Sequence, residues 1–242
     1  MTALRRRRPG AQPYAAIAAL SLVVGLTGCG GGAIGAPQAS LPSATPSAAS
    51  RSVPADEGPI EPGTYRIPRS DWSAVDFTVT FPEGWTVQFG HIYVKNQDTP
   101  DELGFNAVVV DEIYTDACSG GAVTEVGPGV GDLAAALSQQ QGPTVSGPVD
   151  STIGGHAATR IDLTVPDGFD LAPCNVTDIG LQLWYSRPTD KHIVLLRDSI
   201  VSVYTLDVDG QRQVFMTMRP AAASDEDLRD LQAVLDSVRI GM

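Results

Sequence analysis

Histidine and lysine, two side chains often used for acid–base or nucleophilic chemistry, are few and far apart in this 242-residue chain. The candidates are the histidines His91, His156 and His192 and the lysines Lys95 and Lys191. No serine lies in a G-x-S-x-G elbow or three residues before a lysine, and no H-E-x-x-H motif is present for zinc. A histidine without a neighbouring base or ligand is by default exposed or satisfied by its surroundings. The sequence therefore predicts no catalytic residue, no metal site and no cofactor.

Cys29 is the residue whose surroundings indicate a specific modification. Four arginines at positions 5–8 precede an apolar stretch at 14–27, which ends in Leu26-Thr27-Gly28 just before Cys29. As a helix that stretch would be roughly 20 Å long, short of the roughly 30 Å hydrocarbon core of a bilayer. The arrangement resembles a bacterial lipoprotein signal peptide, 1–28, with its lipobox. The resemblance implies that Cys29 carries acyl chains such as palmitate, which anchor the protein on the extracytoplasmic side of the cell membrane. A secretory signal cleaved elsewhere is the alternative.

The other two cysteines, Cys118 and Cys174, form an even pair once Cys29 is occupied by lipid. Disulfides persist in exported chains, so we predict that these two are bonded. They lie 56 positions apart, and closing a loop of that length stabilises by roughly 4 kcal/mol in the loop-entropy model. A cysteine metal site or nucleophile is the competing interpretation, but the sequence contains no C-x-x-C spacing.

The chain after the signal is strongly acidic. It keeps 12 basic residues against 28 acidic ones, a net charge of −16. Such a surface disfavours nucleic acid and anionic lipid as partners. Solubility explains this acidic charge adequately. The alternative is that the acidic surface binds cationic ligands or calcium.

Composition divides the chain into a tether and one folded domain. Residues 29–62 are rich in glycine, proline, alanine and serine, with few bulky apolar side chains. Such a segment cannot bury enough surface to offset its ordering entropy, so we expect a disordered tether reaching roughly 30 Å. Residues 63–242 are enough for a single domain with a substantial core.

Strand patterns dominate this domain. Apolar residues alternate at 77–81 and 85–89, and further strands are expected at 104–114, on both sides of Gly154-Gly155 within 145–165, and at 179–185 and 192–196. Asp209-Gly210 predicts a tight hairpin between 201–208 and 211–218. Helices are expected at 132–140 and after Ser224, which has Asp227 three residues on. The pattern favours an α+β fold class, a single domain in which an antiparallel sheet is flanked by two helices.

Aromatic residues suggest a binding surface more than a reaction centre. Trp184 and Tyr185 are adjacent on a predicted strand, so they point to opposite faces and one of them packs inward. Trp72 lies in an irregular segment near the start of the domain. These three residues are the candidate ligand-binding residues, and core packing is the alternative for each.

The order of several short motifs resembles a recurring exported domain of actinobacteria. It runs over about residues 103–240 and includes Asp116-Ala117-Cys118, Ile161-Asp162-Leu163-Thr164-Val165-Pro166, Cys174 and the Asp207–Gly210 turn. Phe81-Pro82-Glu83-Gly84-Trp85 and the terminal helix are similar to PsbP-like lipoproteins, whose fold is a sheet flanked by helices. The resemblance implies an envelope location, a disulfide and a fold class, and it implies no reaction.

These features predict a non-catalytic cell-envelope lipoprotein whose tethered domain binds a ligand or a protein partner. An envelope-acting hydrolase, with a site assembled from residues distant in the sequence, is the first alternative. The second alternative is an accessory subunit of a signalling or transport assembly.

Overall fold

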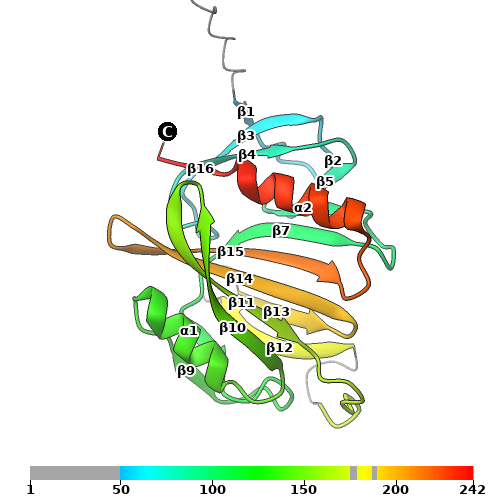
Figure 1. The fold of residues 1–242 in the computed structure, drawn as a ribbon, viewed down its shortest axis with the longest axis vertical. Helices are drawn as coiled ribbons and strands as arrows, with labels where there is room; N and C mark the ends of the chain where they lie inside the picture. Colours follow the sequence, from blue (N-terminus) through cyan, green and yellow to red (C-terminus); the bar gives the residue numbers. More distant parts are fainter. Residues whose placement is uncertain (1–49, 175–178, 187–189, 242) are drawn as a thin grey trace, which may run out of the picture. The chain divides into compact units, whose positions relative to one another are not determined.

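The computed structural model describes residues 50–174, 179–186 and 190–241. In these ranges the chain forms sixteen strands and two helices, and the strands pair into three sheets (Figure 1). The central sheet has the order β10-β11-β14-β15-β7-β6-β5-β2. Its strands are β2 (Gly58–Pro59), β5 (Trp85–Gln88), β6 (Ile92–Lys95), β7 (Leu103–Val108), β10 (Thr144–Ile153), β11 (His156–Thr164), β14 (Ser199–Val208) and β15 (Gln211–Pro220).

Two smaller sheets accompany the central one. The N-terminal sheet has the order β1-β3-β4-β16, and the β12 sheet has the order β13-β12-β8-β9. The first consists of β1 (Arg51–Ser52), β3 (Gly63–Ile67), β4 (Phe77–Phe81) and β16 (Arg239–Ile240). The second consists of β8 (Glu112–Tyr114), β9 (Val123–Glu125), β12 (Gly180–Ser186) and β13 (Lys191–Leu196). Pairing is antiparallel throughout the described strands except between β1 and β3.

The predicted turn and helix signals are present. Asp209 and Gly210 both have positive φ, 52° and 81°, as a type I′ turn requires, and Val208 pairs with Gln211. Helix α2 (Asp225–Ser237) begins after Ser224, whose side chain accepts a hydrogen bond of 3.1 Å from the Asp227 backbone N–H. Helix α1 (Val130–Gln139) begins two residues before the predicted start.

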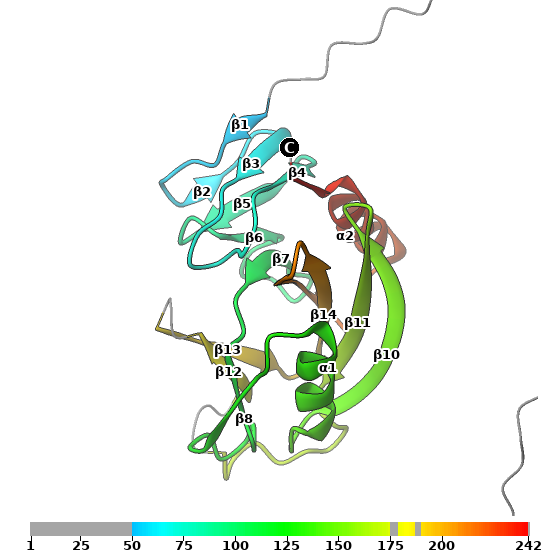
Figure 2. The same cartoon turned by 90° about the vertical axis from the view of Figure 1, so that its left-hand side faces the viewer.

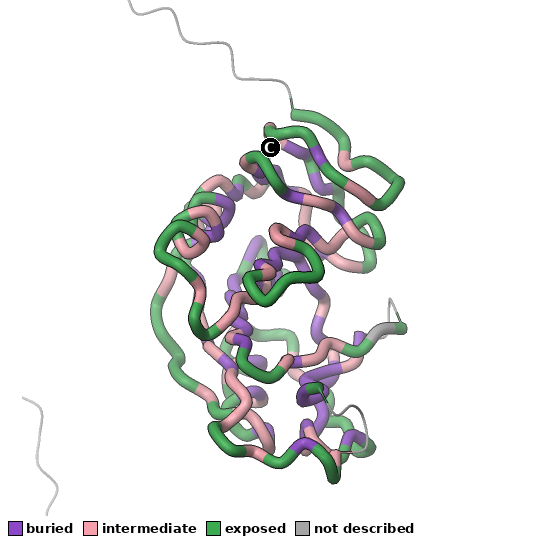
Figure 3. The backbone as a smooth tube through the Cα atoms, turned by 90° about the vertical axis from the view of Figure 1, so that its right-hand side faces the viewer, coloured by how far each residue is buried: buried purple, intermediate pink, exposed green. Residues whose placement is uncertain are grey.

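Two hydrophobic clusters lie on opposite faces of the central sheet. The first lies between this sheet, the N-terminal sheet and α2, and the second between this sheet, the β12 sheet and α1 (Figure 2). Strand β14 contributes side chains to both clusters. Tyr204 and Leu206 pack in the first cluster, and Val201 and Val203 on the opposite face of the strand pack in the second. The buried residues follow these central strands, and the outer loops are exposed (Figure 3).

The expected fold class, α+β with one antiparallel sheet flanked by helices, is wrong. The described chain is predominantly β, and a second sheet together with one helix covers each face of the central sheet. The reason is that periodicity reveals that a segment is a strand and which side chains are buried, but does not reveal its partner strand.

The N-terminal part of the described chain is more ordered than its composition suggests. Residues 50–62 were expected to belong to the tether, yet they form β1 and β2 and bury Ile60 to 5% exposure. The tether prediction for 29–49, like the signal peptide and Cys29, lies outside the described residues. Among the described residues, no helix is long and apolar enough to cross a membrane.

Candidate functional site

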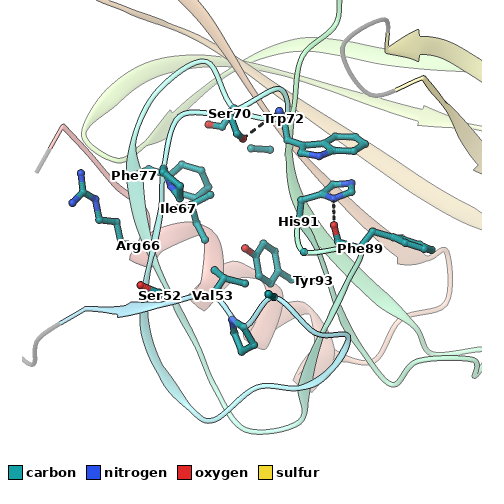
Figure 4. A pocket seen from close by; sticks show the side chains of 16 residues that line it. Ser52, Val53, Arg66, Ile67, Ser70, Trp72, Phe77, Phe89, His91 and Tyr93 are labelled. Atoms are coloured by element: carbon teal, nitrogen blue, oxygen red, sulfur yellow. Dashed lines mark hydrogen bonds between the residues drawn. The ribbon is translucent and has the colours of Figure 1, made fainter.

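A cavity of about 620 Å³ opens where β1 and β3 approach the β5–β6 hairpin (Figure 4). Its volume is in the range of small-molecule sites. Its wall is mostly apolar and aromatic, with serines and one arginine. The lining residues used below are Val53, Arg66, Ile67, Trp72, Phe77, Phe89, His91 and Tyr93.

Trp72 and His91 form one wall of this cavity. Their rings stack with centroids 3.3 Å apart and an interplanar angle of 14°. The Nδ1 atom of His91 lies 2.7 Å from the carbonyl oxygen of Phe89, and because a carbonyl only accepts, Nδ1 carries the proton. Phe89 itself is 68% exposed at the rim of the cavity and has a positive φ of 50°.

The loop that carries Trp72 is fixed to the central sheet by a buried polar contact. The Ser73 hydroxyl and the Val75 backbone N–H both lie within hydrogen-bond distance of Gln213 Oε1, at 3.1 and 3.2 Å. Ser73 and Gln213 are fully buried, and Gln213 comes from β15. Two backbone hydrogen bonds between Ser70 and Ser73 close the loop. The position of Trp72 is therefore determined by residues about 140 positions further along the chain.

Tyr93 supplies a buried polar group to the cavity. Its side chain is 1% exposed, and its hydroxyl has no hydrogen-bond partner among the described protein groups. The ring extends from β6, stacks on Phe81 at 4.5 Å, and directs its oxygen toward Phe77 and Ile67 (Figure 4). Burial raises the pKa of Tyr93 well above its usual range, so the phenol stays protonated and can donate.

The structure separates the three aromatic residues that the sequence proposed for ligand binding. Trp72 lines the cavity, where its side chain is partly exposed. Trp184 is fully buried in the second cluster, so it is a core residue and does not reach a surface. Tyr185 is partly exposed on the opposite face of the same strand, as alternation predicted. Sequence reasoning missed His91 and Tyr93 as cavity residues, because no spacing rule connects them to position 72.

A second polar cluster surrounds Tyr185 on the outer face of the β12 sheet. His192 Nδ1 lies 2.8 Å from the Tyr114 hydroxyl, which also accepts a hydrogen bond of 3.2 Å from Gln182 Nε2. Tyr185 donates to Asp190 over 2.5 Å, and its ring lies 5.1 Å from that of His192. Burial and, to a smaller extent, the nearby Glu112 carboxylate raise the pKa of Tyr114.

The geometry of this second cluster does not favour catalysis. The Tyr114 hydroxyl accepts from Gln182 Nε2 and lies within hydrogen-bond distance of His192 Nδ1, so it is held between two side-chain partners. His192 is exposed and does not line the cavity described above. Acid–base catalysis gains most where water is excluded from the reacting group.

The two cysteines of the domain and the nearby Asp116 stabilise the fold. Cys118 and Cys174 form the predicted disulfide, with sulfur atoms 2.03 Å apart. The Asp116 carboxylate accepts hydrogen bonds from the backbone N–H groups of Cys118 and Ser119 at 2.9 and 3.2 Å. No group of three or more histidine, cysteine or acidic side chains within the described ranges is arranged to hold a metal ion.

Comparisons with known proteins add little to this geometry. No protein-family model matches the sequence, and no curated protein sequence matches it. Among solved structures, the chain is similar to the crystal structure of LpqN, which is described as involved in cell envelope biogenesis of Mycobacterium tuberculosis. The alignment covers 77% of this chain and 91% of LpqN, at 15% identity and a TM-score of 0.33. A likeness of this size carries no argument about function.

Proposed function

We propose that this chain is a lipid-anchored protein of the cell envelope whose domain binds a small, mostly apolar molecule in the aromatic cavity, without catalysing a reaction. The envelope location is inferred from the sequence, through the arginines at 5–8, the short apolar stretch and Cys29. In this proposal residues 1–28 are removed, and the segment from Cys29 to the first described residue links the anchor to the domain.

The observation that carries the binding proposal is the aromatic wall of the cavity. Trp72 and His91 stack over a space of about 620 Å³, and Phe77, Tyr93 and Ile67 line its interior. A concave, mostly apolar site with a few fixed polar groups is the usual form of a small-molecule site. The alternative of an envelope hydrolase has less support, because His192, the histidine of the polar cluster on the β12 sheet, is exposed.

Titration of the full chain with the neutral fluorophore N-phenylnaphthylamine tests this function. Trp85 and Trp184 are fully buried, whereas Trp72 is partly exposed. Trp72 is therefore the tryptophan whose side chain can contact the bound probe. We expect saturable binding with one probe per chain, and about tenfold weaker binding in Trp72→Ala, because a lost aromatic contact changes affinity by roughly that factor.

A matched control removes an exposed apolar side chain elsewhere. Val149 lies on β10 with 49% exposure and does not line the cavity, so Val149→Ala should bind the probe like the original chain. Absence of saturable binding, or equal affinity in Trp72→Ala and the original chain, would rule out the cavity as the binding site.

A further inference from the structure

The Tyr93 hydroxyl is a buried donor that no described protein group uses. Its oxygen lies inside a mostly apolar wall and has no hydrogen-bond partner in the described chain. A buried hydroxyl without a partner is destabilising, and a phenylalanine would fill nearly the same volume without that cost. The residue is therefore poorly explained by packing alone.

Other polar groups of the cavity wall are already engaged or lie at its rim. The Ser73 hydroxyl donates to the Val75 carbonyl at 2.8 Å and lies 3.1 Å from Gln213 Oε1. The Arg66 side chain is 58% exposed and lies 3.9 Å from the Asp76 carboxylate. Tyr93 differs from both because its hydroxyl is buried, protonated and directed into the cavity (Figure 4).

We propose that the ligand of this cavity is an apolar, ring-containing molecule that places a carbonyl-type oxygen at its buried end, where this oxygen accepts a hydrogen bond from the Tyr93 hydroxyl. This inference rests on the proposed function, since it specifies the chemistry of the same site. The apolar body of the ligand packs against Trp72, Phe77 and Ile67. The ligand oxygen supplies the acceptor that the Tyr93 hydroxyl lacks. This hydrogen bond makes the site bind such a ligand more tightly than a hydrocarbon of the same shape.

Two naphthalenes that differ in one group test the inference. Acetylnaphthalene and ethylnaphthalene, substituted at the same ring position, have similar shapes, and only the first has an acceptor oxygen. Each would displace N-phenylnaphthylamine from the full chain. In Tyr93→Phe we expect acetylnaphthalene to bind about five- to tenfold more weakly, while the affinity for ethylnaphthalene changes less than twofold.

Tyr185→Phe is the matched control, because it also removes one phenol oxygen but on the outer face of the β12 sheet. It should leave both affinities unchanged. Tyr93→Phe is expected to fold with at least the original stability, since its hydroxyl has no partner to lose, and urea unfolding checks this.

The outcomes separate the two proposals. If Tyr93→Phe weakens both naphthalenes equally, or neither, the hydrogen bond to Tyr93 is refuted while ligand binding by the cavity stands. If the fluorophore itself does not bind to the original chain, the proposed function and this inference both fail. If the fluorophore binds but neither naphthalene displaces it, this inference fails while the proposed function stands.

Discussion

Gly180 lies where β12 passes very close to the backbone of β13. A Cβ atom at this position would overlap the carbonyl oxygen of Leu195 and come within 2.9 Å of its carbonyl carbon. These are backbone atoms of a paired strand, so they cannot move aside without disturbing the ladder. Gly131 differs, because it lies in α1 and a Cβ there would meet nothing within 4 Å.

Alanine at these two positions should therefore have opposite effects. We expect Gly180→Ala to lower the free energy of unfolding by about 1–3 kcal/mol, because of the steric overlap. We expect Gly131→Ala, in the first turn of α1, to raise it by about 0.5 kcal/mol, because alanine has fewer conformations in the unfolded chain than glycine. Urea unfolding followed by circular dichroism measures both. A neutral Gly180→Ala would show that β12 and β13 can move apart at little cost.

At the scale of elements, α2 is attached to the central sheet by charge as well as by its apolar face. Lys95 on β6 contacts Asp230 at 2.5 Å and Asp227 at 3.8 Å, and its side chain is 16% exposed. The hydrogen bond to Asp230 raises the pKa of Lys95, and partial burial opposes this shift. On its inner face α2 buries Leu231, Val234 and Leu235.

Lys95→Met should lower the free energy of unfolding by about 1 kcal/mol at neutral pH. Because the pKa of Lys95 is higher in the folded state, its contribution is complete below the ordinary lysine pKa of about 10.4. It disappears as the pH rises through the raised pKa of the folded state. Urea unfolding of both proteins from neutral to strongly alkaline pH measures this difference.

Arg66→Met is the control for this ion pair. Arg66 and Asp76 are 58% and 46% exposed and lie 3.9 Å apart, so this pair should contribute close to nothing. If the difference between the original chain and Lys95→Met stays constant across the alkaline range, the ammonium group is not the source of the stabilisation.

At the scale of the whole molecule, one covalent bond joins two distant parts of the chain. The disulfide connects Cys118, which follows β8, to Cys174, which lies between β11 and β12. The bond therefore closes a loop that contains β9, α1, β10 and β11. Reduction should release this constraint on the unfolded chain and lower the free energy of unfolding by roughly 4 kcal/mol.

Intact mass spectrometry of the membrane-extracted protein tests the anchor and this bond together. We expect the mass of a chain that starts at Cys29 and carries acyl groups, because the short apolar stretch before Cys29 fits a cleaved signal better than a span. We also expect two thiols that are alkylated only after reduction. An unlipidated chain with free thiols at Cys118 and Cys174 would contradict both predictions.

Local signals were sufficient for many of the individual elements, although no strand was expected at β3, β6 or β9. Asp209-Gly210 predicted the hairpin turn, and Ser224 predicted the start of α2, because each signal depends on backbone groups within three residues. The cysteine count predicted the disulfide, since the export signal leaves one pair. The fold class was wrong because strand patterns do not specify which strands pair, and three sheets were formed instead of one.

The sequence by itself determined most strands and helices, the disulfide pair and the charge, because each of these depends on residue type and local spacing. The membrane anchor stays a prediction from the sequence. Only the tertiary structure decided that Trp72 stacks on His91, that Trp184 is a core residue, and that Tyr93 directs an unpartnered hydroxyl into the cavity. These properties depend on contacts between segments far apart in the chain, such as the one from Ser73 to Gln213. Strand pairing creates such contacts, and local periodicity does not encode them.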